Sequence, residues 1–502
     1  MSLLGLDVGT TGCKAIIFDL QGRILGQGYQ EYPLIYPQPG WAELDSDGVW
    51  AATGQAIRAA SEQAGRADPV RALAISTQGE AVTPIDRQGR ALANTIVTFD
   101  SRTIPQSEWW EATLGRQAIF QISGQPLHPM YTINKIMWWK QHRPELYQQA
   151  WKFLCYGDLT SYRLGADPGI DYSMACRTMA FDLHQERWSE QILDLAGVEA
   201  GRLATPAPSG TVIGKVSRAA ADELGLPVGA AIVTGGHDQP CGALGAGIIE
   251  PGVAMDATGT VECITPAFDH PVLTDAMLQY NYPCYCHVAP GMYVALAFNF
   301  TGGSLLRWYR DVLGKQERDE AEVSGLDVYH IMLGLAADGP SSVFVLPHFT
   351  VTGTPWLDNY AKGAILGLSL ATSKGDLIKG MLDGITYEMR LNLDYLAEAG
   401  VQINKLRAIG GGAKSAIWLQ LKANIFNRPV YVLSVSEAAC LGAALLAGVA
   451  VGEYREVDQA VAATVQVTES YQPEPAQVAR YQERYQIYRQ IYPTLKDLVH
   501  QM

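Results

Sequence analysis

Basic residues are scarce in this sequence, and they form no cluster. The chain has 37 Lys and Arg against 51 Asp and Glu, which gives a formal net charge of −14. Proteins that bind nucleic acids do so largely through clustered Lys and Arg that neutralise backbone phosphates. The charge balance therefore argues against a nucleic-acid partner and favours a small-molecule partner.

A long hydrophobic run and a recognisable export signal are also missing. The longest apolar run, residues 438–451, is interrupted by glycines and is too short to cross a bilayer. No basic segment precedes the apolar residues of the opening MSLLGLDVG, and no cleavage-like site follows them. We therefore expect a cytoplasmic protein with no membrane partner.

The eight cysteines lack the CxxC spacing of a zinc site, so free thiols are expected. Cys284, Cys286 and His287 lie close enough in sequence to suggest a metal site. Alternate residues of an apolar stretch more often share one face of a strand, however. A structural role is the favoured interpretation of these three residues.

Hydrophobic residues, by contrast, are abundant enough for more than one packed core. They make up 48% of the 502 residues, and only 18% are charged, which argues against a disordered chain. The length of the chain predicts roughly two to four domains.

Glycine is concentrated in the stretch TGGHDQPCGALGAG, residues 234–247, which follows the apolar run 230–233. Its glycines allow a ligand to approach the backbone, and Asp238 and Gln239 are its only side chains with carboxylate or amide chemistry. Asp238 is a candidate catalytic base. It could equally cap the helix that residues 239–244 would start, and the local sequence does not separate these two roles.

The N-terminal region predicts an antiparallel meander. Asp7 lies near the end of its first strand, and Gly9, Thr10 and Thr11 belong to the turn that follows. Backbone amides, hydroxyls and a nearby acid suit a phosphate with its Mg²⁺, so these residues form a candidate phosphate site. The alternative is a plain hairpin turn, which needs glycine without any such function. The three strands are expected at residues 3–8, 13–19 and 23–30.

A helix predicted at residues 46–64 separates the meander from a buried strand at 71–76. That strand leads into Gln78, Gly79 and Glu80. Polar groups at the end of a buried strand in an α/β sheet commonly line a ligand, so these residues are candidates for substrate binding.

The second half of the chain repeats the hairpin pattern. The segment MDATGTVECI, residues 255–264, predicts a strand, a turn and a strand, and its turn contains Thr258, Gly259 and Thr260. This echo of acid, glycine and threonine suggests two similar domains, each of which offers a phosphate-binding turn to one nucleotide.

Two further glycine-rich segments precede predicted helices. Gly303 lies in TGGS before a helix that should reach Val312, where backbone amides could meet a phosphate. Gly411, Gly412 and Ala413 lie in GGGAKS between a strand and a helix, and they would form a flat surface on which a purine can lie. An ordinary strand-to-helix turn is the alternative, although such a turn does not require three glycines.

Other features have structural interpretations. Arg102 can form a bidentate pair with Asp100. The tyrosine-rich segment 474–500 predicts a last helix that docks onto a domain.

Together, these motifs resemble the FGGY carbohydrate kinases, the family of xylulokinases, glycerol kinases and gluconate kinases. The chain departs from the family pattern at Trp139 and Gly380, which are packing positions. The matching segments span nearly the whole chain and read DVGTTGCKA, MYTINKIMWWKQH, GGHDQPCGALGAG, GAILGLSLATSKGDLIKGMLD, GGGAKS and EAACLGAALLA.

The resemblance implies an α/β fold with two actin-like (ribonuclease H-like) ATPase domains and an interdomain cleft. Residues 1–247 would bind the sugar, and residues 248–502 would bind ATP and end in the docking helix. With ATP and Mg²⁺ as cofactors, Asp238 would accept the proton of the attacking substrate hydroxyl, and Asp7 would hold the metal through water. The residues expected at ATP and its phosphates are Gly9, Thr10, Thr11, Thr258, Gly259, Thr260, Gly303, Gly411, Gly412 and Ala413.

The resemblance leaves the substrate open. Glycerol kinases carry Arg followed by Glu after the strand of the first domain, where this chain has Gly79 and Glu80, and Met130 stands where they use Tyr. The missing guanidinium and phenol would leave volume for a longer substrate, a ketose or polyol of about five carbons, as in a xylulokinase. The residues expected to bind its hydroxyls are Gln78, Gly79, Glu80, Asp238 and Gln239.

The alternative function is an actin-like switch that uses ATP to change shape and has no sugar substrate. It would account for both phosphate turns. It would not account for Gln78 and Glu80 at a strand end, or for Asp238 beside Gln239. A homodimer is left open as a further partnership.

Overall fold

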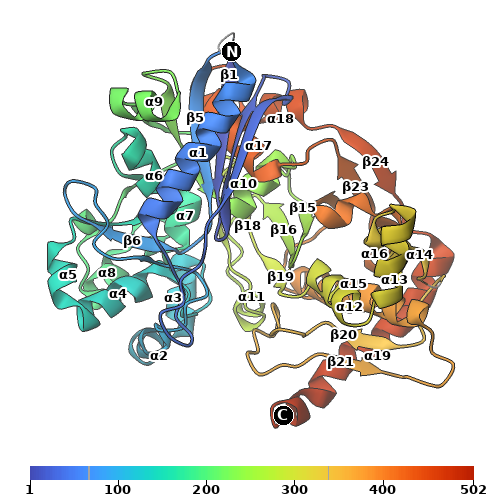
Figure 1. The fold of residues 1–502 in the computed structure, drawn as a ribbon. Helices are drawn as coiled ribbons and strands as arrows, with labels where there is room; N and C mark the ends of the chain where they lie inside the picture. Colours follow the sequence, from blue (N-terminus) through green and yellow to red (C-terminus); the bar gives the residue numbers. More distant parts are fainter. Residues whose placement is uncertain (66–67, 337) are drawn as a thin grey trace.

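The computed structural model describes residues 1–65, 68–336 and 338–502, which form two α/β halves (Figure 1). Each half is built on its own mixed sheet. The first sheet has six strands, in the order β13 (Val212–Lys215), β14 (Ala231–His237), β5 (Val70–Thr77), β1 (Ser2–Val8), β2 (Gly12–Phe18) and β3 (Ile24–Glu31). The second runs β17 (Tyr285–Cys286), β18 (Tyr293–Val294), β16 (Glu262–Phe268), β15 (Val253–Thr258), β22 (Lys405–Ile409), β23 (Val430–Leu433) and β24 (Val467–Tyr471), with β19 (Ala297–Asn299) paired to β16.

The remaining strands form small sheets. A four-stranded sheet of the first half has the order β4 (Glu43–Leu44), β7 (Thr95–Ile96), β6 (Val82–Ile85) and β8 (Lys152–Cys155). Two-stranded pairs join β9 (Gly169–Asp171) to β12 (Thr205–Ala207), β10 (Phe181–Asp182) to β11 (Arg187–Trp188), and β20 (Phe344–Leu346) to β21 (Ala364–Leu366).

Helices surround both main sheets. Those of the first half are α1 (Ser46–Ala64), α2 (Ile104–Thr113), α3 (Arg116–Ser123), α4 (Thr132–His142), α5 (Pro144–Gln149), α6 (Tyr156–Leu164), α7 (Tyr172–Cys176), α8 (Glu190–Ala196), α9 (Arg218–Leu224) and α10 (Asp238–Gly245). Those of the second half are α11 (Asp275–Gln279), α12 (Gly303–Val312), α13 (Lys315–Ser324), α14 (Val328–Gly334), α15 (Lys374–Glu398), α16 (Ala416–Phe426), α17 (Ala438–Ala450), α18 (Val457–Thr464) and α19 (Pro475–Val499). Single 3₁₀ turns lie at Ala200–Arg202 and Gly411–Lys414.

The predicted meander is confirmed, since β1 pairs antiparallel with β2 and β2 with β3. The first half continues with α1, capped by the Asp45 side chain, and with β5, which pairs in parallel with β1. β1 is buried on both faces because α1 covers one and α17 the other. Leu4 and Leu6 belong to the core formed with α1, whereas Leu3 packs into the core formed with α17.

The predicted internal repeat is also confirmed. In the second sheet β15 pairs antiparallel with β16 and in parallel with β22, just as β1 does with β2 and β5. Next to these, β23 is parallel to β22, as β14 is to β5. The two sheets therefore share one topology, and each begins with a strand, a glycine turn and an antiparallel return strand.

Helices α10 and α17 connect the halves and cross at glycines (Figure 1). A Cβ at Gly245 would lie 1.8 Å from the carbonyl oxygen of Ala438, and one at Gly442 would lie 1.9 Å from that of Cys241. A Cβ at Gly5 of β1 would similarly lie 1.8 Å from the Cys440 carbonyl oxygen. Only glycine allows these backbones to approach so closely. The small-residue helix α17 thus packs onto the sheet of the first half, although it comes from the end of the chain.

The segment around β17, which follows residue 248 in the chain, also packs against the first half. The Cys284 amide donates to the Gly124 carbonyl over 2.8 Å, and β17 packs against α7. This places the buried Tyr285 beside residues of the first half, where it takes part in the candidate site.

The last helix docks as predicted. Its tyrosines at 481, 485, 488 and 492 are buried against the second half, and each hydroxyl has a hydrogen-bond partner. Tyr488 donates to Glu388 over 2.7 Å, and Tyr492 donates to Asp358 over 2.6 Å. An amphipathic phenol suits such positions, because its ring packs while its hydroxyl is satisfied.

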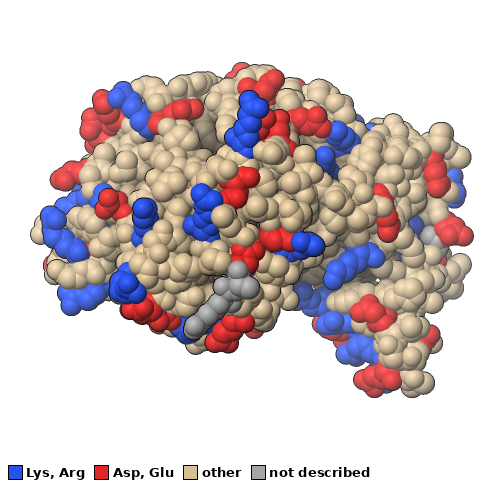
Figure 2. All heavy atoms as spheres, turned by 90° about the horizontal axis from the view of Figure 1, so that it is seen from above, with Lys and Arg blue, Asp and Glu red and all other residues tan. Residues whose placement is uncertain are grey.

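The cysteines agree with the expectation of free thiols. All eight cysteines are buried and free, and Cys286 lies on β17. Within the described residues no group of three or more His, Cys, Asp and Glu side chains is arranged to hold a metal. No helix among them is long and apolar enough to span a membrane. Acidic and basic side chains are interspersed on the face seen in Figure 2.

The helix crossing predicts a stability effect. Gly245→Ala places a methyl group against the Ala438 carbonyl, so α10 and α17 must separate, at a cost of about 1–3 kcal/mol or more. We expect a lower thermal unfolding midpoint. Gly334→Ala is the matched control, because a Cβ there meets nothing within 4 Å. Equal midpoints for the two variants would contradict the close crossing.

Candidate functional site

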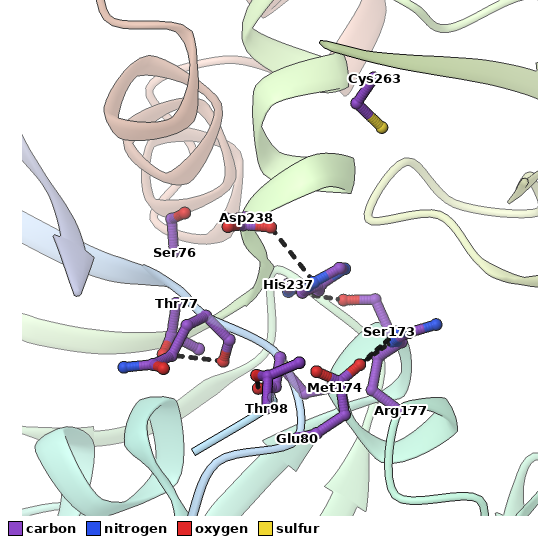
Figure 3. Close-up of polar contacts among 12 residues, drawn as sticks. Ser76, Thr77, Glu80, Thr98, Ser173, Met174, Arg177, His237, Asp238 and Cys263 are labelled. Atoms are coloured by element: carbon purple, nitrogen blue, oxygen red, sulfur yellow. Dashed lines mark hydrogen bonds and ion pairs between the residues drawn. The ribbon is translucent and has the colours of Figure 1, made fainter. Parts of the chain in front are cut away.

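The candidate site lies where three parallel strands end. β1, β5 and β14 place Asp7, Ser76 and Gly236 in one register. The segments that leave these strands carry the first glycine turn, the Gln78 to Glu80 segment and Asp238. Because parallel strands end at the same edge of a sheet, Glu80 and Asp238 come together there (Figure 3).

Asp238 is the first residue of α10, and its side chain is 35% exposed. Desolvation by burial, together with the charges of Asp7 and Glu80, raises the pKa of Asp238 to about 7. A general base works best with a pKa near the operating pH. The N-cap position belongs to His237, whose side chain makes no capping bond, so the structure does not support the interpretation of Asp238 as the cap.

His237 orients the Asp238 carboxylate (Figure 3). Burial and the nearby Arg177 charge hold the pKa of His237 well below its usual range, so the ring is neutral. Its Nε2 lies 3.1 Å from Asp238 Oδ1, and its Nδ1 lies 3.0 Å from the Tyr285 hydroxyl. The imidazole thus contacts the Asp238 carboxylate on one side and shares a hydrogen bond with the Tyr285 hydroxyl on the other. The sequence did not reveal this pair, because Tyr285 comes from the other half.

Gln78 ties the end of β5 to the first glycine turn. Its Nε2 donates to the Gly9 carbonyl over 2.9 Å, and Thr10 Oγ1 donates to its Oε1 over 3.1 Å. The turn itself is closed by a 3.0 Å bond from the Gly9 amide to the Gly12 carbonyl. Thr11 at its tip is exposed. The Gln78 amide therefore holds the turn, and a ligand would have to share it.

Asp7 lies at the same edge. Its Oδ1 accepts a 2.8 Å bond from Ser76 Oγ. Burial raises the pKa of Asp7, whereas the Ser76 bond and the Lys14 ammonium act in the opposite direction. Lys14 is also held 2.5 Å from Glu437, at the start of α17. Asp7 and Asp238 are thus two carboxylates close enough to affect each other's ionisation.

Glu80 is buried and paired with Arg177, a residue that the sequence analysis did not identify (Figure 3). The Arg177 Nε donates to Glu80 Oε1 over 2.5 Å, and its Nη2 contacts the same oxygen. Arg177 Nη1 also donates to Gln125 Oε1 over 2.9 Å. Lys135 donates to the Glu80 carbonyl over 2.9 Å, which fixes the backbone of this residue.

The space beside Gly79 is occupied, which corrects one expectation. A Cβ at Gly79 would lie 2.9 Å from His237 Nε2 and 3.7 Å from Arg177 Nε. The volume that the missing arginine should have left is filled by these two side chains, and Arg177 supplies a guanidinium from elsewhere in the chain. Free volume at this position is therefore no argument for a longer substrate.

The second glycine turn rests on a buried ion cluster. Lys422 of α16 donates to Asp256 over 2.6 Å and to Thr258 Oγ1 over 2.5 Å, and it lies 2.9 Å from Glu262. Burial lowers the pKa of Lys422, but the two neighbouring carboxylates outweigh it and raise this pKa. Burial raises the pKa of Glu262. One ammonium with two carboxylates would leave a buried negative charge, and the raised pKa of Glu262 favours its protonated form. With Glu262 protonated the cluster carries no net charge, and Lys422 holds Thr258 at the turn.

The start of α12 supports the same turn. The Gly303 amide donates to the Gly259 carbonyl over 2.8 Å. The amides of Gly302 and Ser304 both donate to the Thr260 carbonyl, over 3.0 and 3.2 Å. A Cβ at Gly303 would lie 2.7 Å from the Gly259 carbonyl oxygen. These amides are used by the turn, which revises the expectation that Gly303 meets a phosphate directly. Gly303 contributes by holding Gly259 and Thr260.

The three glycines after β22 have different constraints. Gly410 has φ of 82°, and a Cβ at Gly412 would lie 2.6 Å from the Thr258 Cβ. Gly411 is exposed, and its Cβ would come no closer than 3.9 Å to any atom. Gly410 and Gly412 are thus required by packing against Thr258, whereas Gly411 faces open space and Ala413 is half-buried behind it.

Two further polar side chains lie near the site, the unpredicted His128 and the predicted Gln239. His128 is half-buried, and burial with the charges of Arg177 and Lys135 lowers its pKa to about 4. The Gln239 side chain is partly exposed, but its Oε1 is buried and has no partner among the described residues. Isolated residues such as Arg177 and Lys422 could be found only from tertiary contacts, because no local pattern surrounds them.

Two family models match the chain. The N-terminal domain of the FGGY family of carbohydrate kinases matches residues 2–245, and the C-terminal domain of that family matches residues 256–451. A xylulose kinase from Staphylococcus epidermidis is 28% identical over 501 residues, covering 99% of this chain and 97% of that protein. An autoinducer-2 kinase from Yersinia enterocolitica is 31% identical over 510 residues, covering 99% and 95%.

Solved structures share the fold over their full length. A xylulose kinase from Rhodospirillum rubrum superposes with a TM-score of 0.90 at 25% identity, covering 100% of both chains. A gluconate kinase from Lactobacillus acidophilus gives 0.89 at 24% identity, covering 98% of each chain, and a Plasmodium falciparum glycerol kinase with ADP gives 0.84 at 20% identity, covering 97% of each chain. The chain therefore belongs to the FGGY family of carbohydrate kinases and is an ATP-dependent sugar phosphotransferase.

Proposed function

We propose that this kinase transfers the γ-phosphate of ATP to a hydroxyl of a five-carbon ketose or polyol, with Asp238 as the general base. The observation that carries the base assignment is the carboxylate at the meeting point of three strand ends, with a pKa of about 7. The relatives named xylulose kinase support a pentulose.

In this mechanism the protein positions and deprotonates the acceptor. His237 Nε2 lies 3.1 Å from Asp238 Oδ1, and Oδ2 would accept the proton of the substrate hydroxyl as the hydroxyl oxygen attacks the γ-phosphorus. Glu80, Gln78 and Gln239 surround the same edge and would bind the other hydroxyls. The leaving group is ADP, which the second half of the chain would retain.

Asp7 fits a role at Mg²⁺. Mg²⁺ is usually bound through one or two carboxylates plus substrate phosphates and waters, and a cage of protein ligands is not required. The half-buried Asp7, held by Ser76 beside Asp238, offers such a carboxylate. Its counterpart Asp256 is already neutralised by Lys422. The metal would supply charge neutralisation on the transferred phosphate.

The nucleotide would lie between the two glycine turns. Thr10 and Thr11 on one side, and Thr258 to Thr260 on the other, offer hydroxyls and amides to phosphate oxygens. Gly411 would leave room for the adenosine. The alternative of an ATP-driven switch without a sugar substrate has no further support, because the chain belongs to a family of carbohydrate kinases.

A substrate panel tests the proposed function. We expect kinetics with glycerol, erythritol, xylulose, ribulose, gluconate and fructose to place a five-carbon compound near the top and glycerol among the poorest, measured as kcat/KM in a coupled ADP assay. Glu80→Ala should impair the best substrate, since a site built around buried polar groups rejects ligands that leave them unpaired. Glycerol as the best substrate would refute the proposal.

Replacing the base gives a second prediction. Asp238→Asn should lower kcat by roughly 10² to 10⁴, the contribution typical of a positioned general base, while ATP binding stays nearly intact. Because the base acts when ionised, wild-type kcat/KM should fall as pH drops below about 7. The residual kcat/KM of the variant should not show this fall at low pH. Near wild-type turnover would remove Asp238 from the mechanism.

The proposed nucleotide site gives a third prediction. Gly411→Val should weaken ATP binding far more than sugar binding, as measured by isothermal titration, because the side chain enters the space proposed for the purine. The protein tolerates a Cβ there, so folding should be unaffected, whereas Gly412→Val would clash with Thr258 in the absence of ligand. Unchanged ATP affinity in Gly411→Val would place the nucleotide elsewhere.

A further inference from the structure

We infer that the Glu80–Arg177 ion pair makes the sugar site selective for uncharged sugars and polyols and excludes aldonates. This deepens the proposed function and rests on it for the location of the substrate. Arg177 follows α7, and Glu80 follows β5, so the pair joins two segments that meet at the candidate site (Figure 3). The question is whether the buried guanidinium is available to an anionic ligand.

Every nitrogen of the Arg177 guanidinium already faces a partner in the protein. Nε and Nη2 contact Glu80, Nη1 donates to Gln125, and Nη2 also lies 3.4 Å from Met130 Sδ. The rings of Tyr131 and Tyr285 lie 5.3 and 5.4 Å from its central carbon. The residue is 6% exposed. A buried cation needs such a counter-charge, so Glu80 stabilises Arg177 and at the same time occupies it.

The surrounding charges also balance. Lys135 lies near Glu80 and Asp100, and Arg102 pairs with both Asp100 and Glu43. His128 and His237 are neutral, because burial and neighbouring cations lower the pKa of each. Arg177 and Arg102 thus pair with carboxylates, whereas Lys135 donates to the backbone carbonyl of Glu80. All three cations are buried, so none of them is exposed to a ligand carboxylate.

The uncommitted polar atoms favour hydroxyl groups. Gln125 Nε2 is a buried donor, and Gln239 Oε1 a buried acceptor, without a partner in the described part of the chain. A hydroxyl can satisfy either atom, because it both donates and accepts, whereas a carboxylate only accepts. An aldonate would bring its charge close to Glu80 and Asp238 and leave it unpaired. A neutral polyol of the same length avoids this penalty.

Loss of the Glu80 charge should reverse the preference. Glu80→Gln leaves the Arg177 fork without its counter-ion, and an unpaired guanidinium binds carboxylates in bidentate fashion. The double variant Glu80→Gln with Arg177→Gln removes both charges of the pair, so no unpaired guanidinium remains in the site. It is the matched control, because it carries the same change at residue 80.

The test uses two ligands that differ at one terminal carbon, where one is neutral and the other is charged. Xylitol and xylonate have the same chain of hydroxyls, and one ends in a hydroxymethyl group where the other has a carboxylate. We expect isothermal titration with ADP present to show wild-type protein binding xylitol at least about tenfold more tightly than xylonate. The ratio should shift at least about tenfold toward xylonate in Glu80→Gln and return in the double variant.

Several outcomes would overturn the inference. Wild-type protein that binds xylonate as tightly as xylitol, or binds neither, refutes it without any variant. A ratio unchanged in a folded Glu80→Gln refutes it as well, with circular dichroism and the thermal midpoint as the folding check. Wild-type protein that selects xylitol but phosphorylates no neutral sugar would instead refute the proposed function and leave the charge selection standing.

Discussion

The parallel register of β1, β5 and β14 is the constraint on which the site depends. It places Asp7, Ser76 and Gly236 side by side, so three distant segments reach the same edge of the sheet. A slip by one residue in a strand would turn its side chains to the opposite face. Close packing maintains this register, because a Cβ at Gly235 would lie 2.0 Å from the Ile75 carbonyl oxygen and one at Gly5 would meet α17.

The duplicated topology makes the two halves similar, but their acids are used differently. Asp7 and Asp256 each lie one pair before the end of a parallel ladder, opposite Ser76 and Ala408. Ser76 donates a hydrogen bond and leaves Asp7 its charge, whereas Ala408 cannot, and Lys422 neutralises Asp256 instead. One half thus presents a carboxylate, and the other presents a turn without net charge. Such a division suits a metal on one side and the nucleotide phosphates on the other.

Residues from the second half of the chain contact the candidate site and the sheet of the first half. The Tyr285 hydroxyl reaches His237 from the second half, and α17 packs under β1 and β5. The surroundings of His237, which lies beside Asp238, therefore depend on a residue that follows the first half of the chain.

Local apolar patterning and short motifs in the amino-acid sequence predicted the glycine turns and the strand ends, and the resemblance of these motifs to a known family predicted the two-domain α/β fold and the role of Asp238. The sequence could not reveal the Glu80–Arg177 pair, the Lys422 cluster or the filled space beside Gly79. Glu80 and Arg177 are 97 residues apart, and Lys422 and Asp256 are 166 apart. No periodicity connects such residues. Only the packing of whole sheets and helices brings them within hydrogen-bond distance, and that packing decided which charges in the site are paired.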